Sequence, residues 1–179
     1  MFVTHESETE TRDARLAMQG DAAARDRLFE EIYARILRYH RKLAAGRPAL
    51  AEELTQEAMV RLIRSFDQLR EPGRFVPWAF RIATNVWRDH RRPKGARGTD
   101  APAEAPAGGR VAEREELAQR VLEEVGRLPE TYRVVLTLHY LEGMEYEAMA
   151  DVLDTPVPTL RSQIARGRQM IRRQLGEDR

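Results

Sequence analysis

A stretch of proline, glycine and alanine divides this chain of 179 residues into two parts. The stretch reads PKGARGTDAPAEAPAGGR, from Pro93 to Arg110, and it offers almost no side chain that a core could bury. Burial of so little apolar surface cannot offset the entropy lost when such a segment becomes ordered. We therefore predict a flexible linker over 93–112, between a first domain at 1–92 and a second domain at 113–179.

Helical periodicity dominates both parts, and no segment shows the convincing alternation that is typical of a strand. Asp21 is a good N-cap for a long helix, and Gly20 ends the short helix before it. We therefore expect an all-α protein of two small helical domains. The helices are expected, in chain order, at 13–20, 21–44, 51–69, 75–92, 115–128, 130–143, 145–153 and 158–175. The apolar residues expected to share the buried face of the third helix are Leu54, Ala58, Leu62 and Ile63.

The net charge of +1 hides a segregation of charge along the chain. Acidic residues gather near the N-terminus and at 51–57 and 112–124, whereas basic residues gather at 81–97 and 161–173. Two separate basic clusters predict two local anion-binding faces rather than a uniformly basic surface. Charged residues make up 33% of the chain and aromatic residues only 7%, which favours small helical domains over a large β core.

The composition also indicates a compartment. The chain contains no cysteine, which excludes disulfides and thiolate metal sites and fits a reducing cytoplasm. No apolar run approaches the roughly 20 residues of a membrane-spanning helix, and the N-terminal sequence MFVTHESETETRD lacks the apolar segment of a signal peptide. We therefore expect a cytoplasmic protein without membrane insertion.

Nothing in the sequence argues for catalysis. We find no glycine-rich phosphate loop, nucleophile elbow or paired-carboxylate motif. The four histidines, His5, His40, His90 and His139, show no metal-ligand spacing and are each expected at the surface or at its boundary. We therefore expect no enzymatic activity, no cofactor and no bound metal.

The most specific signal in the second part is YEAMADVLDTPVPTLRSQIARGR, from Tyr146 to Arg168. A short helix is followed by a tight turn at Asp154 and by two prolines, which suit the first turn of another helix. Two helices at a steep angle, the second with a polar outer face, have the geometry that enters a DNA major groove. A helical hairpin with a solvated charged face is the alternative that periodicity alone leaves open. The residues expected to face the duplex are Thr159, Arg161, Ser162, Gln163 and Arg166.

The stretch FVPWAFRIATNVWRDHRR, at 75–92, holds both tryptophans of the chain. At about 100° per residue, its apolar residues share one arc and its polar residues share another. Arginines that neutralise phosphates, aromatic edges that stack on bases and an amide that bonds a base edge suit single-stranded DNA. Trp78 lies at the seam between the arcs, where a core role stays open, and Trp87 lies on a third side without an explanation. The polar arc consists of Arg81, Asn85, Arg88 and Arg92.

Two blocks of the chain resemble the extracytoplasmic-function group of bacterial sigma factors. LPETYRVVLTLHYLEGMEYEAMADVLDTPVPTLRSQIARGRQMIRRQL is similar to the family's C-terminal domain, which reads the promoter −35 element. LAEELTQEAMVRLIRSFDQLREPGRFVPWAFRIATNVWRDHRR is similar to its N-terminal domain, and the order of the blocks matches the family. Asp154 stands where the family usually has glycine, which aspartate tolerates because it visits the left-handed conformation readily. Glu145, Pro158 and Gln163 also depart from the family pattern, and Gln163 could change the base preference.

The resemblance implies a function and a set of partners. It implies a sigma factor that binds core RNA polymerase at the β′ clamp helices and the β flap and directs it to promoter DNA. In the family, the helix at 75–92 and the preceding loop open the −10 element and hold a flipped base of the non-template strand, so Trp78 and the polar arc are expected there. The base preference of the loop Leu69–Arg74 is not readable from the sequence. The polymerase-docking residues implied are Glu52, Glu53, Gln56, Glu57 and Arg61.

Alternatives remain at this stage. The acids at 52–57 are also typical of a helix N-terminus, which the helix macrodipole favours. A stand-alone helix-turn-helix regulator would bind duplex DNA without polymerase, and a helical adaptor would bind no DNA at all. Many family members are held inactive by an anti-sigma factor wedged between the two domains, and the linker would permit such a partner here.

Overall fold

The computed structural model describes residues 4–92, 120–121 and 123–176, with side chains described from residue 8 onward. Among these residues every regular element is helical, which confirms the all-α class. Two short 3-10 turns, η1 and η2, join α3 to α4. The first part of the chain comprises α1 (Thr4–Met18), α2 (Ala22–Ala44), α3 (Pro48–Ser65), η1 (Phe66–Gln68), η2 (Pro72–Arg74) and α4 (Phe75–Arg91).

The second part of the chain forms a smaller set of helices. Described helical residues at 120–121 and 123–127 come first, within the helix expected at 115–128. α6 then changes from α- to π-helical geometry at the segment named η3. Within the described residues, no helix has both the length and the apolar character needed to cross a membrane. After these residues, the second part continues with α6 (Glu130–Leu136), η3 (Thr137–Leu141), α7 (Tyr146–Leu153) and α8 (Val157–Gln174).

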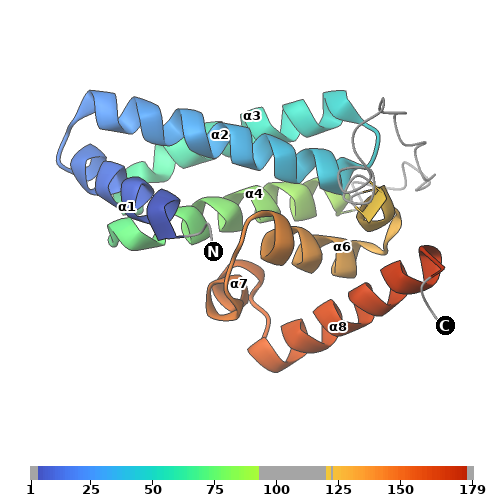
Figure 1. Ribbon diagram of the computed structural model, residues 1–179. Helices are drawn as coiled ribbons and strands as arrows, with labels where there is room; N and C mark the ends of the chain where they lie inside the picture. The colour runs from blue at the N-terminus through green and yellow to red at the C-terminus, as the bar shows by residue number, and fades with distance from the viewer. Residues whose placement is uncertain (1–3, 93–119, 122, 177–179) are drawn as a thin grey trace.

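The core of the first part lies where α2, α3 and α4 pack together (Figure 1). α1 packs across α2 and against η2. Asp21 caps α2 as expected, because its side chain accepts a hydrogen bond from the amide of Ala24 at 2.9 Å. Gly20 has a φ of 95° and follows the end of α1, as a helix-terminating glycine does.

α1 begins nine residues earlier than the helix expected at 13–20. Its polar N-terminal half is held by tertiary ion pairs with α2 rather than by an apolar stripe. Glu10 pairs with Arg35, and Asp13 pairs with Arg27 at 2.7 Å. The guanidinium of Arg27 lowers the pKa of the Asp13 carboxyl. Periodicity in α1 could not predict these contacts, because they depend on α2.

The expected burial of Ile63 is wrong. Leu54, Ala58 and Leu62 are buried as expected, whereas Ile63 is 60% exposed and Val60 is 46% exposed. A helix can bury only the stripe that meets its neighbours, and Ile63 lies at the edge of that stripe. The result is a small apolar patch on the outer face of α3.

The expected surface position of His40 is also wrong, since its side chain is fully buried. Its Nε2 lies 3.1 Å from the carbonyl oxygen of Ala83, and its Nδ1 lies 3.0 Å from the hydroxyl of Thr55. Because a carbonyl only accepts, Nε2 carries the proton of the neutral ring. The single proton of the Thr55 hydroxyl then serves either Nδ1 or the carbonyl of Ala51, 2.7 Å away. Burial lowers the pKa of His40 to about 4, from an ordinary value of 6.5.

This burial predicts a loss of stability in mild acid. Between about pH 6.5 and pH 4 the unfolded chain binds a proton at His40 while the folded chain does not. The contribution of His40 to the free energy of unfolding should therefore be complete above about pH 6.5. It should fall by about 3 kcal/mol down to pH 4, at 1.36 kcal/mol per pKa unit. Urea unfolding at stepped pH measures this slope. His40→Gln should lose it and His90→Gln, at an exposed site, should keep it; equal slopes in all three proteins would contradict the assignment.

The helix-turn-helix geometry is present in the second part. Asp154 adopts the left-handed conformation at φ 51°, as expected, and reverses the chain between α7 and α8. Leu160, Ile164 and Gly167 form the buried stripe of α8. A Cβ at Gly167 would lie 2.8 Å from a methyl carbon of Leu136, so glycine allows α8 to approach α6 closely.

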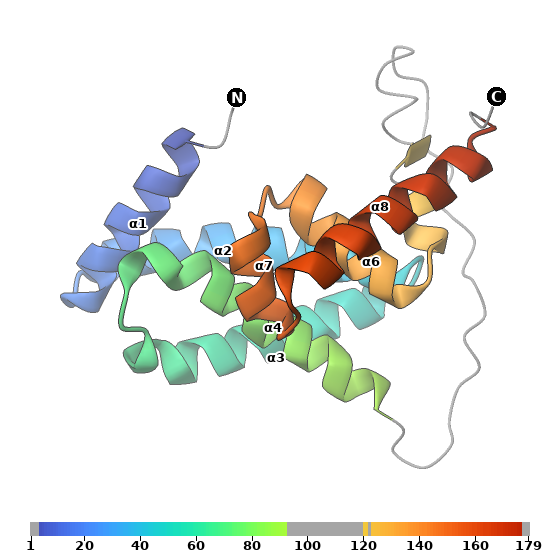
Figure 2. The same cartoon turned by 90° about the horizontal axis from the view of Figure 1, so that it is seen from below.

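The two parts of the chain pack against each other. α7 packs on α4, and α6 packs on the C-terminal half of α2 (Figure 1). The view from below shows α7 crossing α4, with α8 on the outside (Figure 2). This closed arrangement was not predicted. The predicted linker at 93–112 lies outside the described residues, and the boundaries 1–92 and 113–179 stay a prediction.

Candidate nucleic-acid interface

α4 separates an apolar side from a charged side, as its sequence predicts. Phe75, Ala79, Ala83 and Val86 are buried, and Ile82 is half-buried at the edge of this side. Most of the charged residues on the opposite side are exposed arginines. Their guanidinium groups can bind phosphate. The exposed residues there are Arg81, Asn85, Arg88 and Arg92.

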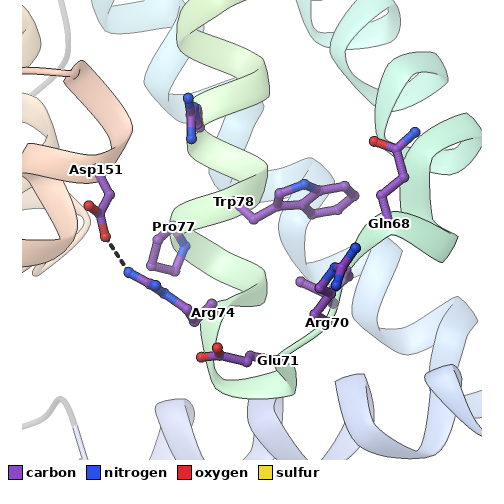
Figure 3. A pocket seen from close by; sticks show the side chains of 9 residues that line it. Gln68, Arg70, Glu71, Arg74, Pro77, Trp78 and Asp151 are labelled. Atoms are coloured by element: carbon purple, nitrogen blue, oxygen red, sulfur yellow. Dashed lines mark hydrogen bonds and ion pairs between the residues drawn. The ribbon is translucent and has the colours of Figure 1, made fainter.

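Trp78 borders an open hollow of about 290 Å³. The hollow lies where the start of α4 meets the segment that joins it to α3 (Figure 3). The half-buried ring of Trp78 points toward Gln68 and Arg70, and its inner side packs on Phe75 with ring centroids 6.1 Å apart. The volume of the hollow is at the lower end of the range of about 300–1,000 Å³ for small-molecule sites.

The rim of this hollow is cationic, with acids on one side. Arg70, Arg74 and Arg81 line it, together with Glu71 and Asp151. Asp151 comes from α7 and forms an ion pair with Arg74 (Figure 3). When the two parts are packed together, Asp151 of the second part therefore pairs with Arg74, which lines the hollow of the first part.

Trp87 is explained by the second part of the chain. Its ring is 2% exposed, and its Nε1 donates a hydrogen bond to Oε1 of Glu130 at 2.8 Å. Arg91 pairs with the other oxygen of Glu130 at 3.2 Å. Arg88, on the expected DNA side, donates to the carbonyl oxygen of Leu153 at 3.1 Å. Trp87 is thus a structural residue of the interface between the two parts.

Glu142 is a further interface residue that the sequence analysis missed. Its side chain has no exposed surface, and it accepts hydrogen bonds from Arg35 at 2.9 Å and from Arg38 at 3.3 Å. Glu142 follows the π-helical segment η3, where its own amide donates to the carbonyl of Thr137 at 3.2 Å. Arg133 adds a hydrogen bond to the carbonyl oxygen of Leu43 at 2.6 Å. No local pattern reveals these partners, because they lie about ninety or more residues apart.

α8 presents the second expected site. It forms the outer edge of the second part, with α6 between it and the first part (Figures 1 and 2). Its buried stripe faces α6, so its polar side meets solvent. Thr159, Arg161, Ser162 and Arg166 are exposed, and Gln163 is half-buried. The guanidinium carbon of Arg161 lies 5.3 Å from the ring centroid of Tyr146 on α7, a contact that the sequence analysis missed.

The outer face of α3 carries the third expected set. Glu52, Glu53, Gln56 and Glu57 are exposed. Arg61 is half-buried and bonded to Glu57 at 2.5 Å and to Asp89 of α4 at 3.0 Å. At helical spacing, Glu53, Gln56, Glu57, Val60 and Ile63 follow one another along a single face.

The site has no metal-binding cluster within the part of the chain that the structure describes. It is instead a set of three separate surfaces. The hollow also includes Gln68, Arg70 and Arg74, which were not among the expected site residues. The signal that could have identified them is their position in or beside the loop before α4, which the resemblance assigns to the −10 element. Two exposed cationic faces and one acidic face with an apolar end can bind nucleic acid and a protein partner.

Comparison with known protein families agrees with this division into two parts. The family described as sigma-70 region 2 matches residues 28–97. The family described as sigma-70, region 4 matches residues 118–171. The first match contains α4 and the lining of the hollow except Asp151, and the second contains α7 and most of α8.

Curated relatives and solved structures point the same way. The ECF RNA polymerase sigma-E factor of Escherichia coli (strain K12) is 33% identical over 134 residues, which cover 66% of this chain and 70% of the relative. The RNA polymerase sigma-H factor of Pseudomonas aeruginosa is 32% identical over 138 residues, covering 68% and 70%.

The fold is also that of two solved structures. The structure of CnrH in complex with the cytosolic domain of CnrY has a TM-score of 0.68 at 24% identity, covering 96% of this chain and 99% of that chain. The sigma factor RpoE of Bartonella quintana, in complex with the anti-sigma factor NepR, has a TM-score of 0.69 at 17% identity, covering 86% and 98%. The chain belongs to the extracytoplasmic-function group of the sigma-70 family of RNA polymerase sigma factors.

Proposed function

We propose that this sigma factor holds the −10 element through the hollow beside Trp78 and reads the −35 element through α8. The observation that carries the proposal is the placement of two exposed arginine-bearing faces on the two matched regions. The protein supplies strand capture and base readout rather than chemistry. Because core RNA polymerase is the proposed partner, the cytoplasm is the proposed place of action of the protein.

For the −10 element, the hollow combines two groups that suit a flipped base, and a charged face continues from it along α4. The Trp78 ring offers a face for stacking, and the Gln68 amide can bond a base edge. The exposed side chains of Arg81, Asn85 and Arg88 continue from the hollow along α4 toward Arg92. These side chains are placed to follow the phosphates of one strand.

For the −35 element, α8 is the recognition helix. Arginine can bond the major-groove edge of guanine through two N–H groups, so Arg161 and Arg166 are the proposed guanine contacts. Gln163 can bond adenine in the same groove. Thr159 and Ser162 are proposed to hold phosphates, which positions the helix without selecting a sequence.

For polymerase, the proposed docking face is the outer side of α3. Glu52, Glu53, Gln56 and Glu57 form its acidic end, with Arg61 beside them, and Val60 and Ile63 form an exposed apolar end. Exposed apolar residues rimmed by polar ones are typical of protein interaction sites. The β′ clamp helices are the proposed partner of this face, and the β flap is the proposed partner of the second domain.

The closed arrangement cannot serve both DNA sites at once. The −10 and −35 elements lie about 25 base pairs apart, or about 85 Å along the duplex at 3.4 Å per base pair. A compact chain of this size measures only about 40 Å across. We therefore propose that the two parts separate when polymerase and promoter bind, and that an anti-sigma factor is a further partner that binds the closed form.

A stand-alone helix-turn-helix regulator is the alternative function. It would bind duplex DNA tightly without polymerase, and it has no use for the docking face of α3. The matches over both regions do not favour it.

The test of the −10 proposal is Trp78→Ala in the reconstituted holoenzyme. Loss of one base–aromatic stack should weaken binding to a promoter fragment with a single-stranded −10 segment by about 1–3 kcal/mol. Binding to a fully duplex fragment that carries only the −35 element should not change. Trp78→Phe keeps a ring and serves as the matched control. Equal affinity of Trp78→Ala and the unaltered protein for the single-stranded segment would reject the assignment.

A further inference from the structure

Arg161 differs from a freely moving surface arginine in one respect. Its guanidinium lies over the ring of Tyr146, with the central carbon 5.3 Å from the ring centroid. No carboxylate among the described residues forms an ion pair with Arg161. The aromatic face therefore holds the cation while its N–H groups stay available to another partner.

The ring of Tyr146 is itself held in place. It is half-buried, and the ring of His139 packs against it with centroids 5.0 Å apart and an angle of 31°. The Nδ1 of His139 donates to the carbonyl oxygen of Met144 at 3.1 Å, which fixes the orientation of the histidine. The ring of Tyr140 makes an edge-to-face contact with the His139 ring, with centroids 4.8 Å apart. Three rings in contact thus lead from the π-helical segment to Arg161.

The position of Tyr146 makes this contact more than ordinary packing. Tyr146 begins α7, whereas Arg161 lies in the second turn of α8, beyond the left-handed turn at Asp154. The contact therefore joins the two helices of the helix-turn-helix on its outer side. An arginine that must give up free rotation on binding loses conformational entropy, and a contact formed beforehand reduces that loss.

We propose that Tyr146 is a positioning residue for −35 readout, because it holds the guanidinium of Arg161 ready for a bidentate contact with a base edge. The inference rests on the proposed role of Arg161. Tyr146 itself touches no base in this proposal. A phenylalanine at position 146 would keep the aromatic face, whereas a leucine would keep the apolar packing and remove the face.

The experiment uses the full-length chain in a holoenzyme with core polymerase and a promoter library randomised at −35. Bound promoters are sequenced for the unaltered protein and for Tyr146→Leu, Tyr146→Phe, Arg161→Ala and the Arg161→Ala/Tyr146→Leu double variant. Tyr33→Leu is the matched control, because it removes an exposed tyrosine ring from α2, outside the ring contacts of Tyr146. Thermal unfolding of each variant reports any change in folding.

We expect Tyr146→Leu to weaken the preference at one −35 position by about 3- to 10-fold, at the position where Arg161→Ala abolishes it. Tyr146→Phe and Tyr33→Leu should stay within about twofold of the unaltered protein, and Tyr146→Leu should add nothing to Arg161→Ala. Additive losses, or a uniform loss across all −35 positions, would overturn the positioning role. If Arg161→Ala alone left every preference unchanged, the proposed role of Arg161 would fall as well.

Discussion

Glu142→Ala is expected to separate the two parts of the chain in the free protein. The buried carboxylate of Glu142 receives Arg35 at 2.9 Å and Arg38 at 3.3 Å across the interface. Without it, both guanidinium groups lose a charged partner in the closed form but regain water in the open form. The closed form should lose about 3 kcal/mol, which is a shift of roughly 100-fold toward the open form.

Trp87 makes this shift measurable. In a Trp78→Phe background it is the sole tryptophan, and its ring is 2% exposed in the closed form. Opening should shift its emission to longer wavelength and increase the radius of gyration in X-ray scattering, while circular dichroism shows unchanged helix content. Glu147→Ala, at an exposed position on α7, is the control. Unchanged emission and an unchanged radius for Glu142→Ala would show that Glu142 does not hold the parts together.

Arg161→Ala combined with Arg166→Ala is expected to abolish promoter selection at −35. Each bidentate contact with a base accounts for about 1–3 kcal/mol of discrimination, so the two losses together amount to about 2–6 kcal/mol. Transcription by the holoenzyme should become insensitive to the −35 sequence. Holoenzyme assembly should be unaffected, because the proposed main docking face lies on α3.

A control with the same loss of charge separates readout from general attraction to DNA. Arg15→Ala with Arg25→Ala removes two exposed arginines from α1 and α2. This double variant should keep the −35 preference. If both double variants weakened transcription equally at every promoter, Arg161 and Arg166 would contribute only phosphate attraction.

Local chemistry accounts for what could be predicted from the sequence. Asp21 accepts the hydrogen bond of an N-cap, and Asp154 adopts the left-handed turn, because both roles depend on neighbours within a few residues. The two faces of α4 and the buried stripe of α8 follow from spacing along a single helix. The resemblance then supplied the functional names of these faces, which residue chemistry alone left open.

The errors and omissions concern contacts between distant segments. His40 looked like a surface residue because its partners, Thr55 and Ala83, come from two other helices. Trp87 had no explanation because Glu130 lies 43 residues further on. Helical spacing places a residue on a face of its own helix, but it does not say which neighbour covers that face.

The most direct test of the account is transcription by core RNA polymerase with and without this protein, on a library of genomic promoter fragments. We expect initiation from a defined subset of fragments only when the protein is present, with shared sequence motifs near −10 and −35. Trp78→Ala should weaken the selection at −10, and the Arg161→Ala/Arg166→Ala variant should remove it at −35. Failure to direct initiation from any fragment, or selection that neither variant changes, would contradict the account.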